Sequence, residues 1–339
     1  MSCVSGSANK FNVGISIASH EREGGSQQSC VIGIDLGGTK LLAGIANVDG
    51  DILTSIEQPT LHGEDGSVLD QMVALISTLL AKSGRSSANL LRVVIGVPAA
   101  VDPKTGLASL SPNLRLPADR SLADAMMAGL SAQNIRCPVV VENDVNLAAL
   151  AEATVALPKG DDTLAFISFG TGVGMGLVVN GALWRGAFGR AGEIGYLPFG
   201  ATPHADAPQS ENGLFEDAVG SKGIRARFSA DNQTVTDLFA AARRGDGPAQ
   251  SAIDDIAQNA SVGLAAVHAL LDPSMTVIGG GIGTQIEFFE ALKRHLKPLL
   301  PFECRIEPSQ FGGQAGMIGA VTLALQGAAE HFEGLQKVC

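Results

Sequence analysis

Two short turns rich in glycine and threonine are the parts of this sequence most suited to chemistry. The first is Gly37-Gly38-Thr39-Lys40, and the second, in the other half of the chain, is Gly170-Thr171-Gly172. Each follows a predicted strand and leads into an apolar run that ends in Asp-Gly or Asn-Gly, which is typical of tight hairpins. Glycine lets backbone N–H groups come close to an anion, and threonine adds a hydroxyl donor. Two such turns in equivalent places predict a duplicated fold that holds a nucleoside triphosphate from both sides.

To catalyse phosphoryl transfer, a protein mainly has to position the reactants and stabilise the charge on the phosphates. The amides and hydroxyls that could contact the β- and γ-phosphates belong to Gly37, Gly38, Thr39, Thr171 and Gly172. Asp35 ends the strand before the first turn, where a carboxylate can hold Mg²⁺ through water, and Lys40 offers a positive charge nearby. The alternative is that the glycines serve two ordinary hairpins and that Asp35 makes a local hydrogen bond in its turn.

The segment Glu142-Asn143-Asp144 follows a predicted buried strand and precedes a predicted helix. In open α/β sheets the carboxyl ends of the strands point into the ligand crevice. An aspartate there can take the proton from an attacking hydroxyl, and the amide of Asn143 can bind a neighbouring hydroxyl. The competing explanation is helix capping, because Asn and Asp are favoured N-cap residues.

Glu193 and Glu216 flank a loop that carries several prolines. Paired carboxylates suit the vicinal hydroxyls of a sugar, because each can accept two donors; each could also be an ordinary solvated surface charge. The run Gly279-Gly280-Gly281 follows a predicted strand and could let an adenine lie flat against the backbone.

The elements expected to position these residues alternate between strand and helix. In the first half, the periodicity predicts a helix over 68–82, a strand over 93–97, a helix over 121–132, a strand over 138–141 and a helix over 145–156. The second half adds a hairpin over 164–179, a helix over 249–271, a strand over 276–278, a tight turn at 279–281 and helices over 285–296 and 315–330. This alternation predicts an α/β fold with mixed or parallel sheets.

Composition excludes several classes of protein. The 339 residues carry a net charge of −11, so the chain lacks the charge of a nucleic-acid binder or of a membrane-surface protein. Aromatic residues make up only 4%, which argues against a surface on which the bases of single-stranded nucleic acid stack. Five widely spaced cysteines without a C-x-x-C pair indicate reduced thiols and a cytoplasmic protein. No apolar run reaches transmembrane length. Residues 1–29 lack the apolar core of a signal peptide and are expected to form a disordered tail.

Several segments together resemble the ROK family of bacterial sugar kinases and related repressors, which belongs to the actin-like ATPase superfamily. The resemblance spans about residues 30–325 and is carried by 34–40, 142–146, 170–174, 192–195 and 312–320. It implies a two-domain, ribonuclease H-like α/β fold with a central cleft that takes ATP and Mg²⁺, a hexose as acceptor, and a homodimer. The expected domains are 30–144, completed by a helix over 315–333, and 145–314.

The resemblance also assigns roles by position. Asp144 would be the catalytic base, and Asn143, Glu193 and Glu216 would bind the sugar. The family commonly has histidine where this chain has Tyr196, followed by a cysteine cluster that binds structural zinc. Here no cysteine occurs between Tyr196 and Glu216, Leu214 stands at the last cysteine position, and His204 is the sole soft donor. We therefore expect no zinc, and expect Tyr196 to replace the histidine contact to the sugar.

Three functions remain open from the sequence. The main expectation is an ATP-dependent hexose kinase acting on the 6-hydroxyl of glucose, with fructose, mannose or an N-acetylhexosamine as alternative acceptors. A second is a sugar-responsive transcriptional regulator, although the residues before Val31 are too few for a helix-turn-helix module. A third is a non-catalytic sugar-binding or ATPase module.

Overall fold

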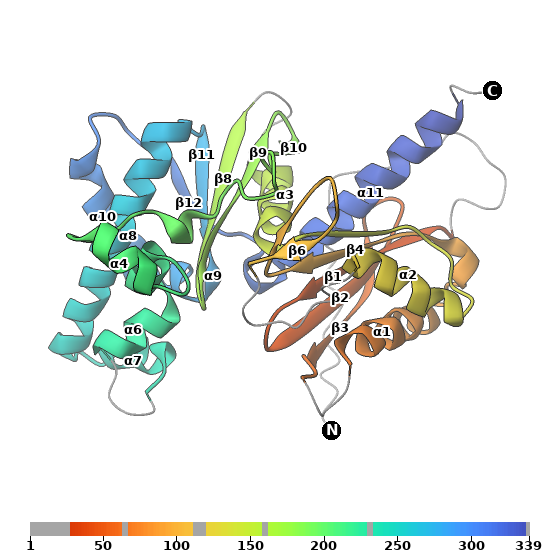
Figure 1. Cartoon of the computed structure of the whole chain (residues 1–339), viewed down its shortest axis with the longest axis horizontal. Helices are drawn as coiled ribbons and strands as arrows, with labels where there is room; N and C mark the ends of the chain where they lie inside the picture. The colour runs from red at the N-terminus through yellow and green to blue at the C-terminus, as the bar shows by residue number, and fades with distance from the viewer. Residues whose placement is uncertain (1–27, 63–66, 111–119, 158–161, 229–232, 337–339) are drawn as a thin grey trace. The chain divides into compact units, whose positions relative to one another are not determined.

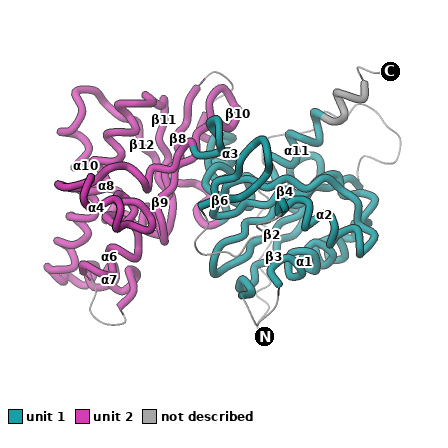
Figure 2. Tube along the Cα trace, in the orientation of Figure 1, with its two compact units in different colours: residues 1–155, 186–190, 314–339 teal, residues 156–185, 191–313 magenta. Residues whose placement is uncertain are grey.

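The computed structural model describes residues 28–62, 67–110, 120–157, 162–228 and 233–336 (Figure 1). The expected tail at 1–29 lies, except for its last two residues, outside these ranges. The chain falls into two compact units (Figure 2). Unit 1 comprises Met1–Val155, Gly186–Arg190 and Gln314–Cys339, and unit 2 comprises Ala156–Arg185 and Ala191–Gly313.

Unit 1 is built on a five-stranded sheet with the strand order β3-β2-β1-β4-β7. The strands are β1 (Cys30–Leu36), β2 (Lys40–Asn47), β3 (Ile52–Pro59), β4 (Leu90–Val97) and β7 (Val139–Asn143). β1, β2 and β3 form an antiparallel meander, whereas β1, β4 and β7 run parallel. The carboxyl ends of these three parallel strands therefore meet at one edge of the sheet. A separate two-stranded ribbon pairs β5 (Ala100–Val101) with β6 (Ala108–Ser109).

Helices cover both faces of the unit 1 sheet because successive side chains of a strand point to opposite faces. Ile32 and Ile34 of β1 pack into an apolar core with α1 (Val68–Ser83) and α2 (Leu122–Ala132). Gly33 and Asp35, on the other face, lie against α11 (Ala315–Gln336). The remaining elements are η3 (Ser87–Asn89) and α3 (Asp144–Ala156). The expected domain boundary after Asp144 falls one residue into α3, whereas the boundary of the compact units follows Val155.

Unit 2 repeats the same sheet plan. Its strand order is β10-β9-β8-β11-β12, with β8 (Thr163–Phe169), β9 (Val173–Val179), β10 (Ala182–Leu183), β11 (Met275–Gly279) and β12 (Ile306–Pro308). β8 and β9 are an antiparallel hairpin like β1 and β2, and β8, β11 and β12 run parallel like β1, β4 and β7. The duplication predicted from the two turns is confirmed at the level of strand order and direction.

The helices of unit 2 enclose an apolar core centred on α8 (Gly247–Leu271) and α10 (Ile286–Leu296). The others are η4 (Ile194–Tyr196), α4 (Pro203–Asp206), η5 (Ala207–Gln209), α5 (Leu214–Val219), α6 (Ser221–Phe228), α7 (Val235–Arg243), α9 (Gly280–Gly283) and η6 (Lys297–Leu299), and η7 (Gly312–Gln314) adjoins unit 1. The tight turn predicted at 279–281 was wrong, because residues 280–283 form the single helical turn α9. Gly280 leaves β11 with a φ of 82°, and the amide of Thr284 then closes a helical hydrogen bond to the carbonyl of Gly280.

Among the described residues, no helix is long and apolar enough to span a membrane.

Glycine in α11 sets how closely that helix packs in unit 1. A Cβ atom on Gly319 would overlap the carbonyl group of Leu147 in α3, and one on Gly33 of β1 would lie 2.6 Å from the amide nitrogen of Val321. The backbones of α3, α11 and β1 therefore approach one another at distances that only glycine permits.

The variant Gly319→Ala should lower the free energy of unfolding by about 1–3 kcal/mol, because the clash is with backbone that cannot move aside. Gly247→Ala is the matched control, since nothing lies within 4 Å of a Cβ added at that helical position. Urea unfolding followed by circular dichroism would measure both. Equal stability of the two variants would contradict the packing argument.

Candidate active site

The first turn, between β1 and β2, is held by its carbonyl groups. The hydroxyl of Thr60 donates to the carbonyl of Gly37 at 2.7 Å, and the imidazole Nε2 of His62 lies 2.7 Å from the carbonyl of Gly38. The amide of Gly37 closes the turn on the carbonyl of Lys40 at 2.9 Å. Within the described chain, neither Gly38 nor Thr39 donates its amide to another residue. Two adjacent N–H groups are thus left for an anion.

The second turn, between β8 and β9, has the same construction. The amide of Gly170 closes it on the carbonyl of Gly172 at 3.0 Å, and Ser221 holds the carbonyls of Gly170 and Thr171 through its hydroxyl and amide. Here too, no acceptor among the described residues takes the amide of Thr171 or Gly172. Both turns therefore use the first amide to close the loop and keep the next two, an arrangement that suits an anion.

The carboxylate of Asp35 lies against the first turn of α11. A Cβ atom on Gly316 would come within 2.6 Å of its Oδ2 atom, so glycine is needed for the two to pack. Burial raises the pKa of Asp35 to about 6, while the charge of Lys40 works in the opposite direction. Lys40 itself forms an exposed ion pair with Glu57, at 3.0 Å. A poorly solvated carboxylate gains from a cation, so Asp35 fits the predicted interaction with Mg²⁺.

Asn143 and Asp144 lie at the junction of β7 and α3. The side-chain oxygen of Asn143 accepts the amide of Asn146 at 2.9 Å, and its Nδ2 donates to the carbonyl of Ala99 at 3.2 Å. Asn143 is therefore a helix cap, as the competing explanation proposed. Asp144 is the first residue of the helix, and its Oδ1 accepts the amide of Val145 at 2.8 Å. Beneath them, the buried carboxylate of Glu142 accepts hydrogen bonds from both asparagines.

All the predicted residues of unit 1 meet at one edge of its sheet. Asp35 pairs in register with Gly96 of β4, and Gly96 pairs with Glu142 of β7. The Cα of Asp144 lies 3.5 Å from the position of a Cβ on Gly96, and the carbonyl of Ile34 lies at the same distance. A Cβ on Gly96 would lie 2.8 Å from Cδ1 of Leu147, so glycine at this position leaves room for that side chain of α3 beside β4.

In unit 2, Glu193, Tyr196 and Glu216 form a second group beside β9. Glu216 is partly buried and accepts the amide of Val173 at 2.8 Å, so it is not an ordinary surface charge. Burial raises the pKa of its carboxyl group. Glu193 precedes η4, which contains Tyr196. Tyr196 is 49% exposed as a residue, and partial burial of its phenol together with the charges of Glu193 and Glu216 raises its pKa.

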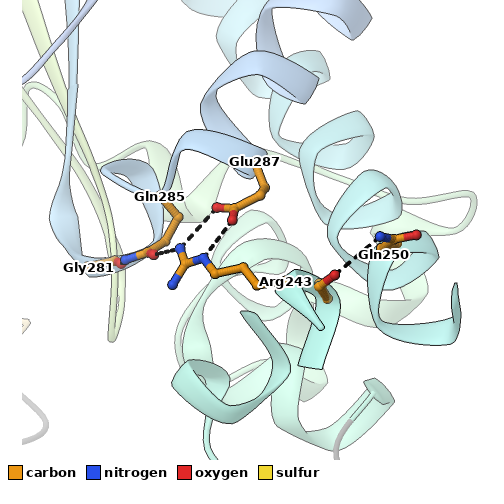
Figure 3. Close-up of polar contacts among 6 residues, drawn as sticks. Arg243, Gln250, Gly281, Gln285 and Glu287 are labelled. Atoms are coloured by element: carbon orange, nitrogen blue, oxygen red, sulfur yellow. Dashed lines mark hydrogen bonds and ion pairs between the residues drawn. The ribbon is translucent and has the colours of Figure 1, made fainter. Parts of the chain in front are cut away.

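Gly280 and Gly281 lie next to the second turn, because β8 and β11 are parallel neighbours. The amide of Gly281 is 3.6 Å from the position of a Cβ on Gly170. Figure 3 shows how this corner is held: Gln285 donates to the carbonyl of Gly281 at 2.9 Å, and Arg243 donates to Gln285 at 2.6 Å and to both oxygens of Glu287. Sequence reasoning missed Arg243 and Gln285, along with Thr60, His62 and Ser221, and none of them has a motif that would reveal its role.

The structure offers no donor set for zinc in the part of the chain it describes, where no group of three His, Cys, Asp or Glu side chains could hold a metal. In the loop between Tyr196 and Glu216, Asp206 bonds to Thr202 and Glu211 pairs with Lys222. His204 is thus left without the partners that a tetrahedral site requires.

Comparison with known proteins decides the family. The model of the ROK family matches residues 31–327. The chain belongs to the ROK family. It is 28% identical to the glucokinase of Halalkalibacterium halodurans, over 87% of this chain and 94% of that protein. It is 29% identical to the beta-glucoside kinase of Listeria monocytogenes, over 89% of this chain and 99% of that protein.

A solved structure gives the same assignment. The ROK family glucokinase of Streptomyces griseus, in complex with glucose and AMPPNP, superposes with a TM-score of 0.69 at 27% identity, over 88% of this chain and all of that one. The fold is the actin-like ATPase fold that was predicted. The family and the named activities together support a sugar kinase as the class of enzyme.

Asp35→Asn should stabilise the nucleotide-free protein at pH 7.5. The folded-state pKa of about 6 lies above the ordinary value of 3.8, so the cost of the buried charge is complete above pH 6 and disappears as the pH falls toward 3.8. We expect a gain on the order of 1–3 kcal/mol at pH 7.5 that shrinks at pH 4.5. Urea unfolding without divalent metal would measure it.

Asp102→Asn is the control for that experiment. Hydrogen bonds from the amides of Lys104 and Thr105 lower the pKa of Asp102, so its charge is favoured by folding and its removal should not stabilise the protein at pH 7.5. A stabilisation by Asp35→Asn that does not depend on pH would contradict the explanation from burial.

Proposed function

We propose that this chain is an ATP-dependent hexose kinase that phosphorylates the 6-hydroxyl of a sugar such as glucose. The observation that carries the proposal is the shared construction of the two turns, each of which keeps two adjacent amides. The relative solved with glucose and AMPPNP supports both substrates.

On the donor side, we propose that the turns formed by Gly37, Gly38 and Thr39 and by Thr171 and Gly172 bind the phosphates of ATP. The amides of Gly38, Thr39, Thr171 and Gly172 would contact the phosphates, while the amide of Gly37 closes its own turn on the carbonyl of Lys40. Lys40 would add positive charge, and Gly280 and Gly281 would face the adenine. Asp35 would hold Mg²⁺ through water, and the ion would neutralise charge on the phosphates. Backbone amides fixed before binding are suited to this task because they need little reorganisation during the reaction.

On the acceptor side, Asn143, Glu193, Tyr196 and Glu216 would bind the sugar hydroxyls. Asp144 would accept the proton of the 6-hydroxyl as its oxygen attacks the γ-phosphorus in line, and the bond to the β-phosphate oxygen would break to release ADP. Because Asn143 also caps α3, its side chain is oriented before the sugar binds.

Glucose is the default acceptor, and fructose, mannose and N-acetylhexosamines are alternatives. The beta-glucoside kinase among the relatives supports testing glucosides as well. We further propose a cytoplasmic homodimer that binds neither nucleic acid nor membranes.

Asp144→Asn should reduce kcat by about 10³-fold or more, because the amide cannot accept the proton but can keep the hydrogen bond to Val145. Coupled ADP release over a panel of hexoses, N-acetylhexosamines and glucosides would measure wild type and variant. The thermal shift caused by the best sugar should be retained in the variant. Substantial turnover by Asp144→Asn would refute its role as the base, and a wild type that turns over no sugar would refute the proposed function.

Gln285→Ala should raise the KM for ATP about three- to tenfold and leave the KM for the sugar unchanged, because the carbonyl of Gly281 loses its donor. Gln250→Ala is a matched control, since Gln250 makes the same kind of bond to the carbonyl of Ala242, away from the glycines (Figure 3). Equal effects of the two substitutions on the KM for ATP would contradict a role for Gln285 at the nucleotide.

A further inference from the structure

The segment from Glu193 to Ser221, here called the acceptor segment, contains three of the four proposed sugar ligands and is described throughout. It is also where a structural zinc would lie by resemblance, and its donor set does not fit that metal. The loop must nevertheless hold Tyr196 and Glu216 in place, because a side chain that is displaced from its position loses its contacts with the sugar. Hydrogen bonds and aromatic contacts connect the parts of this segment instead.

We propose that Phe199, Ser210 and Asp217 form a metal-free latch that replaces zinc and positions the sugar ligands of the acceptor segment. The proposal rests on the proposed function, since it names positioning residues for the same sugar. The latch has a polar part and an aromatic part, and each part connects different stretches of the loop.

The polar part closes residues 210–217 on themselves. The hydroxyl of Ser210 donates to Asp217 Oδ2 at 2.6 Å and accepts the amide of Gly213 at 2.9 Å, and the amide of Asp217 donates to the carbonyl of Gly213 at 2.9 Å. Three bonds among three residues fix the path of the chain immediately before Glu216. Gly213 has a φ of 97°, a conformation that favours glycine.

This closed turn also touches the other side of the acceptor segment. A Cβ atom on Gly213 would overlap the carbonyl of Gly195 and lie 2.9 Å from the Cα of Tyr196. A Cβ on Gly195 would in turn lie 3.4 Å from the Cβ of Glu216. The latch thereby sets the spacing between the backbone that carries Tyr196 and the one that carries Glu216.

The aromatic part ties the middle of the loop to the second turn. The ring of Phe199 packs on that of Phe215, with centroids 5.7 Å apart, and Phe215 packs edge-on against Phe169 at 6.5 Å. Phe215 is fully buried, and its ring fills the space left by Gly263 of α8. Phe169 is the last residue of β8, directly before Gly170. The loop is therefore anchored in the core at the residue next to Glu216.

The polar part is tested by Ser210→Ala and Asp217→Asn, and the aromatic part by Phe199→Ala. Each should raise the KM for the best sugar about tenfold, with the KM for ATP within about twofold of wild type, as loss of one positioning interaction predicts. Thr202→Ala is the matched control, because its hydroxyl bonds to Asp206 in the same loop outside the latch. Equal rises in both KM values, or a rise in Thr202→Ala as large as in the latch variants, would overturn the proposal.

A second arm uses only the wild-type full-length chain. After treatment with a zinc chelator and return to Mg²⁺, its zinc content should be far below one ion per chain and its KM for the sugar unchanged. A loss of sugar affinity that zinc restores would overturn the latch. Because this experiment needs no variant, it tests the proposal even if a latch variant fails to fold.

Hydrogen exchange separates failure of the latch from failure of the proposed function. The amide of Gly213 should be protected in wild type and in Thr202→Ala and should exchange faster in Ser210→Ala, whether or not any sugar is phosphorylated. Fast exchange of this amide in wild type would overturn the latch even for an active kinase. Inactivity on every sugar with a protected Gly213 amide would refute the kinase and leave the latch standing.

Discussion

The orientation of four backbone amides, two in each glycine turn, is the constraint on which the rest of this structure depends. A peptide unit is planar, so fixing its carbonyl oxygen also fixes the direction of the N–H on the same plane. Thr60 and His62 fix the carbonyls of the first turn, and Ser221 fixes those of the second. The amides are thereby aimed during folding, and little entropy is left to lose when an anion binds.

Asp35 shows that such a site lowers the stability of the fold. Its carboxylate is placed against the backbone of Gly316, where burial raises its pKa to about 6. A structure selected for stability alone would have an apolar or amide side chain at that position. The observed residue makes sense where a cation offsets the burial, and it fits the general rule that functional sites break the rules that hold elsewhere in a fold.

Sequence patterns predicted the elements well where the information is local. The helix predicted over 68–82 has a clear apolar spacing and is observed over Val68–Ser83, and the glycine turns show their residues directly. The residues that hold the turns were not predictable, because Thr60 acts on a carbonyl 23 positions away and Ser221 on one 51 positions away. Arg243 reaches Gln285 over 42 positions. Such contacts depend on tertiary packing, and a serine or threonine in a loop is too common to signal them.

The two kinds of ligand in this site are constrained differently. Backbone amides at the turns persist when side chains change, whereas the proposed acceptor residues are side chains, three of them on a segment that contains no cysteine. Glu216 belongs to the acceptor segment and also contacts the strand after the second turn. One of its carboxylate oxygens accepts the amide of Val173, and the other could accept a hydroxyl. Removal of the Glu216 carboxylate itself would therefore leave the amide of Val173 without this acceptor. Tyr196 is 49% exposed and is therefore less constrained by packing than Glu216, whose carboxylate accepts the amide of Val173 in unit 2.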